Sequence, residues 1–456
     1  MKKTIFFIIL GAITSHAQTT KAALEAAVNR LLNEPAATAA SLSFYVSDEN
    51  GNPIYAYHSE KGLSTASTQK IFTAAAALET LGSHYQWTTS VAYIGNLCSG
   101  VLKGDLILTS DGDPTLGSWR YQGYEAENFK QKLTKALKET GLNKIEGRLI
   151  IDDTFFDFQT IPGGWPWNDL GNYYGAGVWG VNWRENQFDL STNGSSLEKT
   201  SPELPNVKWV SEVAVGGNSD QSIIYTAPHS DFALINGTLP EKKMTVSGAM
   251  PNPPLTLGQE IMEELRSQSI EITGGVTTAS QLKISGEPLK TPATAKTFFT
   301  HNSPPLEQVV YWFLSKSVNL YGETLIKTMA KKKLDRSDFK TGIGVLKQFW
   351  TTKGLDPYQV NFADGSGLSP QNYVSAKAEV QALLYIRKQP WFETFYQGLP
   401  TLNGMKMKSG TMKNTKSFAG YHTSKSGQKY VYAILLNNYQ SPKLSEALYN
   451  VLNVLK

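Results

Sequence analysis

The sequence is organised around one stretch, Ser64-Thr65-Ala66-Ser67-Thr68-Gln69-Lys70-Ile71-Phe72-Thr73-Ala74-Ala75-Ala76-Ala77-Leu78. A side-chain oxygen of Ser64 or Thr65 can accept a hydrogen bond from an unpaired backbone N–H, which predicts the start of a helix here. Residues 71–81 are almost wholly apolar, so this helix is predicted to be buried on every side. Gly82 follows and can take the left-handed conformation that ends helices.

Ser67 and Lys70 lie three residues apart, and this spacing places both side chains on one face of a helix. A hydroxyl at a helix start is close to the positive end of the helix dipole, which favours an alkoxide. An amine beside it can take its proton if the pKa of that amine is lowered, so the pair predicts a serine nucleophile activated without histidine. Alone, the same residues also fit a capped helix whose lysine reaches solvent.

The length and the first residues indicate a secreted protein of two or three domains. The chain has 456 residues. Residues 1–17 combine a basic start, a short apolar run and a small-residue site, which predicts a signal peptide cleaved near Ala17. The apolar run is too short to cross a bilayer. We therefore expect a mature protein that is soluble or loosely held at a membrane.

Charge and cysteine content exclude several classes of function. The formal net charge is +4, and loss of residues 1–17 leaves +2, so no nucleic-acid partner is expected. Cys98 is the only cysteine, so an intrachain disulfide is excluded. With six scattered histidines, the chain has little material for a metal site, and none is expected.

The pattern along the chain predicts a domain interrupted by an insertion. Residues 18–87 contain a helical pattern, a strand hairpin and the Ser67 helix, and form the first part of the domain. Residues 88–295 are rich in short strands, glycine and proline, and are predicted to be an insertion of two subdomains, one nested in the other. Residues 296–456 are predicted to be helical at first, then to form three strands and a last helix over 443–455, so strands from both ends of the chain should share one helix-flanked sheet.

A second polar group follows a predicted helix, at Ser315-Lys316-Ser317-Val318-Asn319. Ser317 and Asn319 are two residues apart in a turn, so both side chains can point into one cleft. The hydroxyl can pass a proton to a leaving amine, and the amide can hold a peptide carbonyl. Ordinary turn and helix-cap chemistry is the alternative for this triplet alone.

A third group is the strand Lys406-Met407-Lys408-Ser409-Gly410-Thr411. If Lys408 lies beside Lys70, repulsion between like charges lowers the pKa of Lys70 and supplies a neutral amine near neutral pH. The alternative is an exposed basic edge strand.

The residues after Lys408 have predicted roles in binding substrate. Ser409 can bind a carboxylate, and Gly410 lets a substrate backbone lie close to the strand. The N–H groups of Thr411 and Ser67 can together form an oxyanion hole.

The three groups match, in order, the S-x-x-K, S-D-N and K-T-G motifs of penicillin-binding proteins and class A β-lactamases, with Val318 and Ser409 as the departures. The chain resembles more closely the D-alanyl-D-alanine carboxypeptidase/endopeptidase family, peptidase family S13, the class C low-molecular-mass penicillin-binding protein 4 type. The segments that carry the resemblance are 67–70, 163–169, 174–177, 317–323, 364–369 and 408–411. This resemblance implies an α+β fold, an antiparallel sheet flanked by helices as in serine β-lactamases and penicillin-binding transpeptidases, with a large strand-rich insertion between the first two motifs.

The resemblance also implies a periplasmic serine hydrolase that cleaves D-Ala-D-Ala or cross-link bonds in peptidoglycan stem peptides. Ser67 would attack the carbonyl and Lys70 accept its proton, Ser317 would relay a proton to the amine, Asn319 would position the acyl group, and Lys408 would hold the local charge. β-Lactam antibiotics would acylate Ser67 as inhibitors, and no metal or organic cofactor would be needed.

Two other functions fit the same residues. A β-lactamase or esterase could use the same triad, although Ser67 and Ser317 are 250 residues apart, too far for an ordinary β-lactamase. A catalytically idle penicillin-binding scaffold is the other, although every polar catalytic position is filled. The oligomeric state and the balance of carboxypeptidase and endopeptidase activity are left open.

Two features of the insertion have both a functional and a structural interpretation. Aromatic residues concentrate at 163–177, as a saccharide or peptide platform or as packing within the protein. Asp152 follows the apolar strand 149–151, where it could hold the amino group of a stem diamino acid or cap the next turn.

Overall fold

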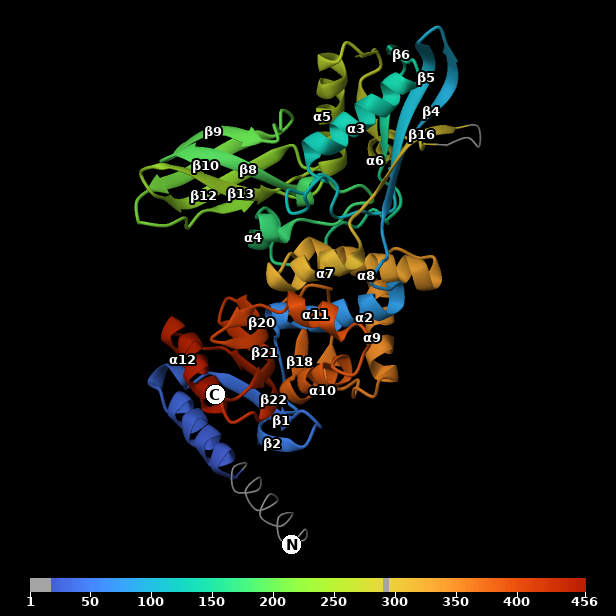
Figure 1. Ribbon diagram of the computed structural model, residues 1–456. Coiled ribbons are helices and arrows are strands. Elements are labelled where there is room, and N and C mark those ends of the chain that lie inside the picture. Colours follow the sequence, from blue (N-terminus) through green and yellow to red (C-terminus); the bar gives the residue numbers. More distant parts are fainter. Residues whose placement is uncertain (1–17, 290–294) are drawn as a thin grey trace. The chain divides into compact units, whose positions relative to one another are not determined.

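The computed structural model describes residues 18–289 and 295–456 (Figure 1). The predicted signal peptide, residues 1–17, lies outside the described residues. Across the described ranges, no helix is both long and apolar enough to cross a membrane. The described residues form two compact units, the first from residues 18–83, 310–318 and 343–456, and the second from residues 84–289, 295–309 and 319–342. The sequence placed the insertion at 88–295, whereas the second unit also takes in residues 84–87, 296–309 and 319–342.

The first unit is built from both ends of the chain. A helix over residues 18–32 opens its described part. The other elements are η1 (Pro35–Ala37), β1 (Ser41–Asp48), β2 (Pro53–Tyr57), β3 (Gly62–Leu63), η2 (Ala66–Gln69), α2 (Lys70–Leu81), α9 (Phe339–Thr352), β17 (Val360–Asn361), β18 (Tyr373–Ser375), α10 (Ala376–Ile386), α11 (Phe392–Gly398), β19 (Thr401–Leu402), β20 (Met405–Met412), β21 (Thr415–Thr423), β22 (Lys429–Asn437), α12 (Pro442–Leu452) and η5 (Asn453–Leu455). Most of α7 (Leu306–Ser315) also belongs to this unit, whereas α9 begins in the second.

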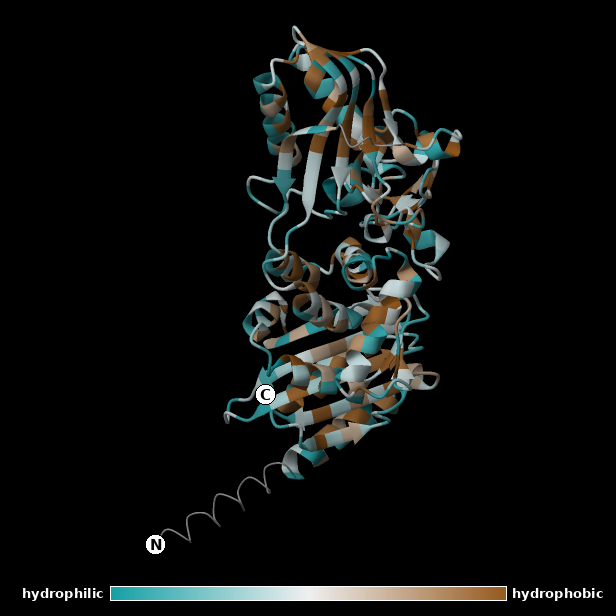
Figure 2. Cartoon of the chain, turned by 90° about the vertical axis from the view of Figure 1, so that its right-hand side faces the viewer, coloured by the Kyte–Doolittle hydropathy of each residue, from teal (hydrophilic) through white to brown (hydrophobic). Residues whose placement is uncertain are grey.

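A six-stranded antiparallel sheet lies at the centre of the first unit, in the order β19-β20-β21-β22-β1-β2. β1 pairs with β22 from Ser41 opposite Asn437 to Asp48 opposite Tyr430, which confirms the prediction that both chain ends share one sheet. The helix over 18–32 and α12 pack on one face of the sheet, and α10 and α2 lie on the other (Figure 1). Hydrophobic residues, brown in Figure 2, lie along strands of both units.

The helix that follows the nucleophile is buried as predicted through residue 78, whereas residues 79–81, which were also predicted to be buried, are half-buried. Residues 70–78 of α2 are all buried, and Gly82 ends the helix with a φ of 90°. Trp350 of α9 closes this core, since its ring lies 5.3 Å from that of Phe72 and its Nε1 donates to the Phe72 carbonyl.

The predicted capping of this helix is wrong. No side chain caps its start, which is a 3-10 turn, η2, that leads directly into α2. The backbone of Ser64 is instead held by Asn437, whose Oδ1 accepts from the Ser64 N–H at 2.7 Å and whose Nδ2 donates to the Ser64 carbonyl at 3.1 Å.

The second unit contains β4 to β16, which lie almost wholly within the predicted insertion. Its elements are β4 (Thr88–Cys98), β5 (Val101–Ser110), α3 (Ala126–Glu139), β6 (Lys144–Glu146), β7 (Leu149–Asp152), α4 (Trp167–Leu170), η3 (Tyr173–Gly175), η4 (Arg184–Asn186), β8 (Gln187–Asn193), β9 (Ser196–Ser201), β10 (Lys208–Val215), β11 (Ile223–Tyr225), β12 (Phe232–Leu239), β13 (Lys243–Ala249), α5 (Pro253–Ser267), β14 (Glu271–Ile272), β15 (Val276–Thr278), α6 (Ala279–Ile284), β16 (Lys296–Asn302) and α8 (Asn319–Leu334). A seven-stranded sheet contains β4 to β7 and β14 to β16, and two three-stranded sheets are formed by β8 to β13.

Two glycines of α9 provide a matched test of packing. A Cβ on Gly342 would lie 2.4 Å from Ile326 Cγ2 and 2.5 Å from the Ile326 carbonyl oxygen, whereas a Cβ on Gly344 would meet nothing within 4 Å. We predict that Gly342→Ala lowers the free energy of unfolding by about 1–3 kcal/mol through overpacking. Gly344→Ala should raise it by about 0.5–1 kcal/mol, because alanine loses less backbone entropy in a helix. Chemical denaturation measures both, and equal effects of the two changes would contradict the packing.

Candidate active site

Ser67 and Lys70 form a hydrogen-bonded pair at the junction of η2 and α2. Lys70 Nζ lies 2.9 Å from Ser67 Oγ and donates to the Ser366 carbonyl at 2.6 Å. The Lys70 side chain is fully buried, and its Nζ lies 5.6 Å from the centre of the Phe313 ring on α7. The structure therefore brings the predicted nucleophile and base together, with an amine in reach of the hydroxyl proton.

The loop that supplies the Ser366 carbonyl is a part of the site that was not predicted from the sequence. Its sequence, 364–369, contributed to the family resemblance, but no role was predicted for it. Asp364 is fully buried and accepts from the backbone N–H groups of Gly367 at 2.7 Å and Ser369 at 2.6 Å. The loop is also bound to α2, because Thr73 Oγ1 donates to the Gly365 carbonyl at 2.7 Å. The signal that could have indicated this role is a loop with two glycines that begins with an acid, Asp364.

The turn before Ser67 is strained and closely packed. Ala66 has a φ of 46°, in the left-handed region that disfavours residues with a Cβ. A Cβ on Gly410 would lie 2.2 Å from the Thr65 carbonyl oxygen and 2.9 Å from the Ser67 nitrogen. Glycine is therefore required at 410 by the protein's own backbone, whereas the predicted close approach of a substrate stays a prediction.

Lys408 is buried on β20, with 2% of its surface exposed, and its Nζ donates to the Ser409 carbonyl at 3.0 Å. Burial, together with a smaller effect of the charge of Lys416 on β21, lowers the pKa of Lys408 to about 7. A lysine with a lowered pKa is thus present. The predicted effect of Lys408 on the pKa of Lys70 stays a prediction.

One edge of β20 is open beside these residues. β21 pairs with β20 along its whole length, from Lys406 to Met412. On the other edge, within the described part of the chain, β19 pairs only with Met405 and Lys406. Residues 408–412 have no strand partner on that edge among the described residues and can take up an added strand, although the Ser409 carbonyl already accepts from Lys408 Nζ. Ser409 and Thr411 lie in this segment.

The second motif contains a hydroxyl suited to relay a proton. Ser317 follows α7 with a φ of 60°, and its Oγ is buried without a hydrogen-bond partner among the described residues. Buried polar groups without partners are rare and point to a functional or strained position.

Asn319, two residues on, begins α8 in the second unit, and its contacts there reveal a further acid. Asn319 Nδ2 donates to the Tyr174 carbonyl at 2.8 Å, and the Tyr174 hydroxyl donates to Asp169 Oδ1 at 3.2 Å. Burial raises the pKa of Asp169. The sequence had placed Asp169 and Tyr174 in the aromatic segment without giving either a role.

Asp152 caps the turn that follows β7. Its Oδ1 accepts from the Thr154 N–H at 3.1 Å and from Thr154 Oγ1 at 2.6 Å. This is the structural role that the sequence left open, and a contact of Asp152 with substrate stays a prediction.

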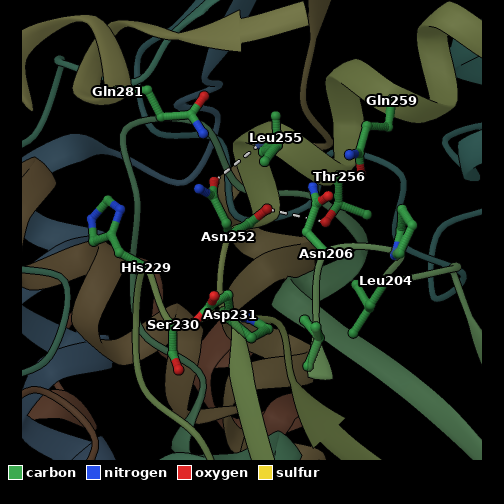
Figure 3. Close-up of a pocket in the computed structure, with 13 residues that line it drawn as sticks. Leu204, Asn206, His229, Ser230, Asp231, Asn252, Leu255, Thr256, Gln259 and Gln281 are labelled. Carbon is green, nitrogen blue, oxygen red and sulfur yellow. Dashed lines mark hydrogen bonds between the residues drawn. The ribbon is translucent and has the colours of Figure 1, made fainter. Parts of the chain in front are cut away.

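A separate pocket of about 210 Å³ lies within the second unit (Figure 3). It is lined by Leu204, Pro205, Asn206, Val207, His229, Ser230, Asp231, Pro251, Asn252, Leu255, Thr256, Gln259 and Gln281. Asn252 Oδ1 accepts from the Leu255 N–H, and Thr256 Oγ1 donates to the Asn252 carbonyl, so part of this lining caps α5. None of the predicted site residues lines this pocket. Among the described residues, no group of three or more His, Cys, Asp or Glu side chains could hold a metal ion.

Comparison with known proteins identifies the family. The model of the D-Ala-D-Ala carboxypeptidase 3 (S13) family matches residues 24–454. D-alanyl-D-alanine carboxypeptidase DacB of Haemophilus influenzae is 26% identical over 434 residues, which cover 89% of this chain and 87% of that protein. D-alanyl-D-alanine carboxypeptidase of Actinomadura sp. strain R39 is 24% identical over 451 residues, 91% of this chain and 81% of that one.

Solved structures show the same fold. Penicillin-binding protein 4 (dacB) from Haemophilus influenzae matches with a TM-score of 0.77 and 23% identity, over 93% of this chain and 98% of that chain. Its complex with a β-lactam matches with a TM-score of 0.72 and 21% identity, over 94% and 98% of the two chains. These matches confirm the predicted fold and the predicted family. The chain belongs to the D-Ala-D-Ala carboxypeptidase 3 (S13) family of serine peptidases.

Proposed function

We propose that this carboxypeptidase cleaves D-Ala-D-Ala bonds of peptidoglycan stem peptides through an acyl-enzyme on Ser67. The observation that carries the proposal is the 2.9 Å contact between Lys70 Nζ and Ser67 Oγ at a buried position. Neutral Lys70 takes the hydroxyl proton as Ser67 Oγ attacks the peptide carbonyl. The resulting ammonium is held by the Ser366 carbonyl, which accepts from Nζ in the present geometry.

Collapse of the tetrahedral adduct requires a proton on the departing D-alanine amine. The unpartnered hydroxyl of Ser317 supplies that proton and recovers one from Lys70. The C–N bond breaks, the ester on Ser67 forms, and water then hydrolyses the ester. Asn319 lies in the second unit, and its predicted role in positioning the acyl group stays a prediction.

The open edge of β20 supports a binding mode for the peptide. An extended stem peptide can add as a strand along residues 408–412, and side-chain pockets then give specificity. Ser409 and the Lys408 ammonium bind the terminal carboxylate. The N–H groups of Ser67 and Thr411 stabilise the oxyanion; the close packing of Gly410 on the Ser67 nitrogen supports this pairing.

A β-lactam reacts with the same serine in this proposal. The complex of penicillin-binding protein 4 from Haemophilus influenzae with a β-lactam supports binding of this class of compound. The leaving group of a penicillin stays attached to the acyl group, so the adduct is released slowly. Slow release distinguishes a carboxypeptidase from a β-lactamase. We also propose that the protein works in the periplasm, where its substrate lies, either soluble or loosely held at a membrane.

The nucleophile is tested by comparing two serines of the same turn. We predict that Ser67→Ala abolishes both hydrolysis and covalent labelling by fluorescent penicillin, because the attacking oxygen is gone. Ser64→Ala should keep both, since the Ser64 hydroxyl has no hydrogen-bond partner within the described ranges. Gel fluorescence and peptide mass spectrometry measure labelling. Covalent labelling of a folded Ser67→Ala protein would sink the assignment.

The charge of Lys408 is tested by the pH dependence of binding. Its folded-state pKa, about 7, lies below the usual 10.5, so the cation is present below pH 7 and is lost above it. In the non-reacting Ser67→Ala chain, the Kd of a peptide ending in D-Ala-D-Ala should rise about tenfold for each pH unit above 7. A C-terminally amidated peptide is the control and should bind independently of pH over this range. Calorimetry that shows the same pH dependence for both peptides would contradict the proposed carboxylate contact.

A further inference from the structure

A buried carboxyl group lies beneath the nucleophile and takes no part in the chemistry above. Glu379 on α10 is fully buried, and its Oε1 lies 2.6 Å from Oγ1 of Thr68, the residue after Ser67. Its Oε2 has no hydrogen-bond partner among residues 18–289 and 295–456. Burial raises the pKa of Glu379 to about 8, and only the hydrogen bond from Thr68 opposes this shift. A carboxyl group in such surroundings is mostly neutral at pH 7.

The protonation state of Glu379 decides which neighbouring oxygen the Thr68 hydroxyl can donate to. Thr68 Oγ1 lies 2.6 Å from Glu379 Oε1, 3.1 Å from the Thr65 carbonyl oxygen and 3.2 Å from Ser417 Oγ, but a hydroxyl has one proton. An ionised Glu379 takes that proton, and the Thr65 carbonyl then keeps its bond from Ser417 Oγ, at 2.5 Å, and a longer one from the Thr68 N–H, at 3.4 Å, but has only one hydroxyl donor. A neutral Glu379 donates to Thr68 and leaves the Thr68 proton for the Thr65 carbonyl.

The Thr65 carbonyl belongs to the strained turn that carries the nucleophile. Thr65, Thr68 and Ser417 are all fully buried, so bulk solvent does not reach the Thr65 carbonyl to replace a missing donor. Ala66, between Thr65 and Ser67, has a φ of 46°. A left-handed alanine costs about 1–2 kcal/mol, and such a conformation persists only where its surroundings hold it. Two hydroxyl donors on the preceding carbonyl are part of what holds it.

We propose that Glu379 is a positioning residue for acylation: as a neutral acid it donates to Thr68, which then holds the Thr65 carbonyl and the turn that directs Ser67. The proposal rests on the proposed function only in taking Ser67 as the nucleophile. Glu379 acts through Thr68 and touches no substrate.

The test separates three properties of the side chain at position 379: its ability to donate a hydrogen bond to Thr68, its charge and its shape. The binding constant and the acylation rate constant for benzylpenicillin are measured by stopped flow for wild type, Glu379→Gln, Glu379→Leu and Thr68→Val. The glutamine amide can donate to Thr68, so Glu379→Gln should acylate within about threefold of wild type. Glu379→Leu and Thr68→Val should each slow acylation by about tenfold or more, with the binding constant nearly unchanged. A double Glu379→Leu/Thr68→Val variant should be no slower than either single variant, because both break one chain of hydrogen bonds.

A specific effect on acylation can be distinguished from a general loss of stability. Thermal unfolding is measured for each variant, and Gly342→Ala serves as a destabilised control that should acylate normally. If Glu379→Leu does not fold, Thr68→Val and Glu379→Gln decide the question. Normal acylation in Thr68→Val, or acylation in Glu379→Gln as slow as in Thr68→Val, would overturn the proposal. A wild-type chain that takes up no penicillin would instead overturn the role of Ser67, and the positioning role with it.

Discussion

The burial of Lys70 is the constraint on which the rest of the first unit depends. A fully buried amine needs acceptors within reach, because the desolvation of an unpaired polar group costs several kcal/mol. Ser67 Oγ supplies one acceptor and the Ser366 carbonyl supplies another. Asp364 fixes the shape of the loop that presents this carbonyl, because its carboxylate accepts from the backbone N–H groups of Gly367 and Ser369 in the same loop. The nucleophile, its base and a loop almost 300 residues away in the sequence therefore form one structure.

The turn before the nucleophile is enclosed by backbone on two sides. A Cβ on Gly367 would lie 1.9 Å from the Ala66 carbonyl oxygen, and a Cβ on Gly410 would lie 2.2 Å from that of Thr65. Both distances are far shorter than a van der Waals contact, so neither neighbour can carry a side chain. The left-handed Ala66 is thus held between the loop and β20, and the reactive hydroxyl has a fixed position at the end of a strained turn.

Much of this arrangement could be predicted from the sequence, and the rest could not for identifiable reasons. Apolar runs and turn residues indicated the hairpin, the buried helix and the sheet shared by both chain ends, and the motif residues indicated Ser67 and Lys70. The Ser366 carbonyl was missed because a backbone acceptor has no side-chain signature. Capping by Ser64 was wrong because Asn437, 373 residues away, holds that backbone instead. Local patterns do not reveal such long-range partners.

The site also sets how the stability of the fold depends on pH. Glu379 has a folded pKa raised from 4.5 to about 8, so between these values the folded chain binds more protons than the unfolded one, and stability falls as pH rises. Lys408 has a folded pKa lowered from 10.5 to about 7, so between about 7 and 10.5 the unfolded chain binds more protons, and stability rises with pH. The contributions of Glu379 and Lys408 to the free energy of unfolding change with pH in opposite directions. Their sum is therefore lowest between about pH 7 and 8. In that same window the neutral forms of both groups are most populated together. Burial of these groups lowers the stability of the first unit near neutral pH, which is the usual consequence of an active site selected for reactivity.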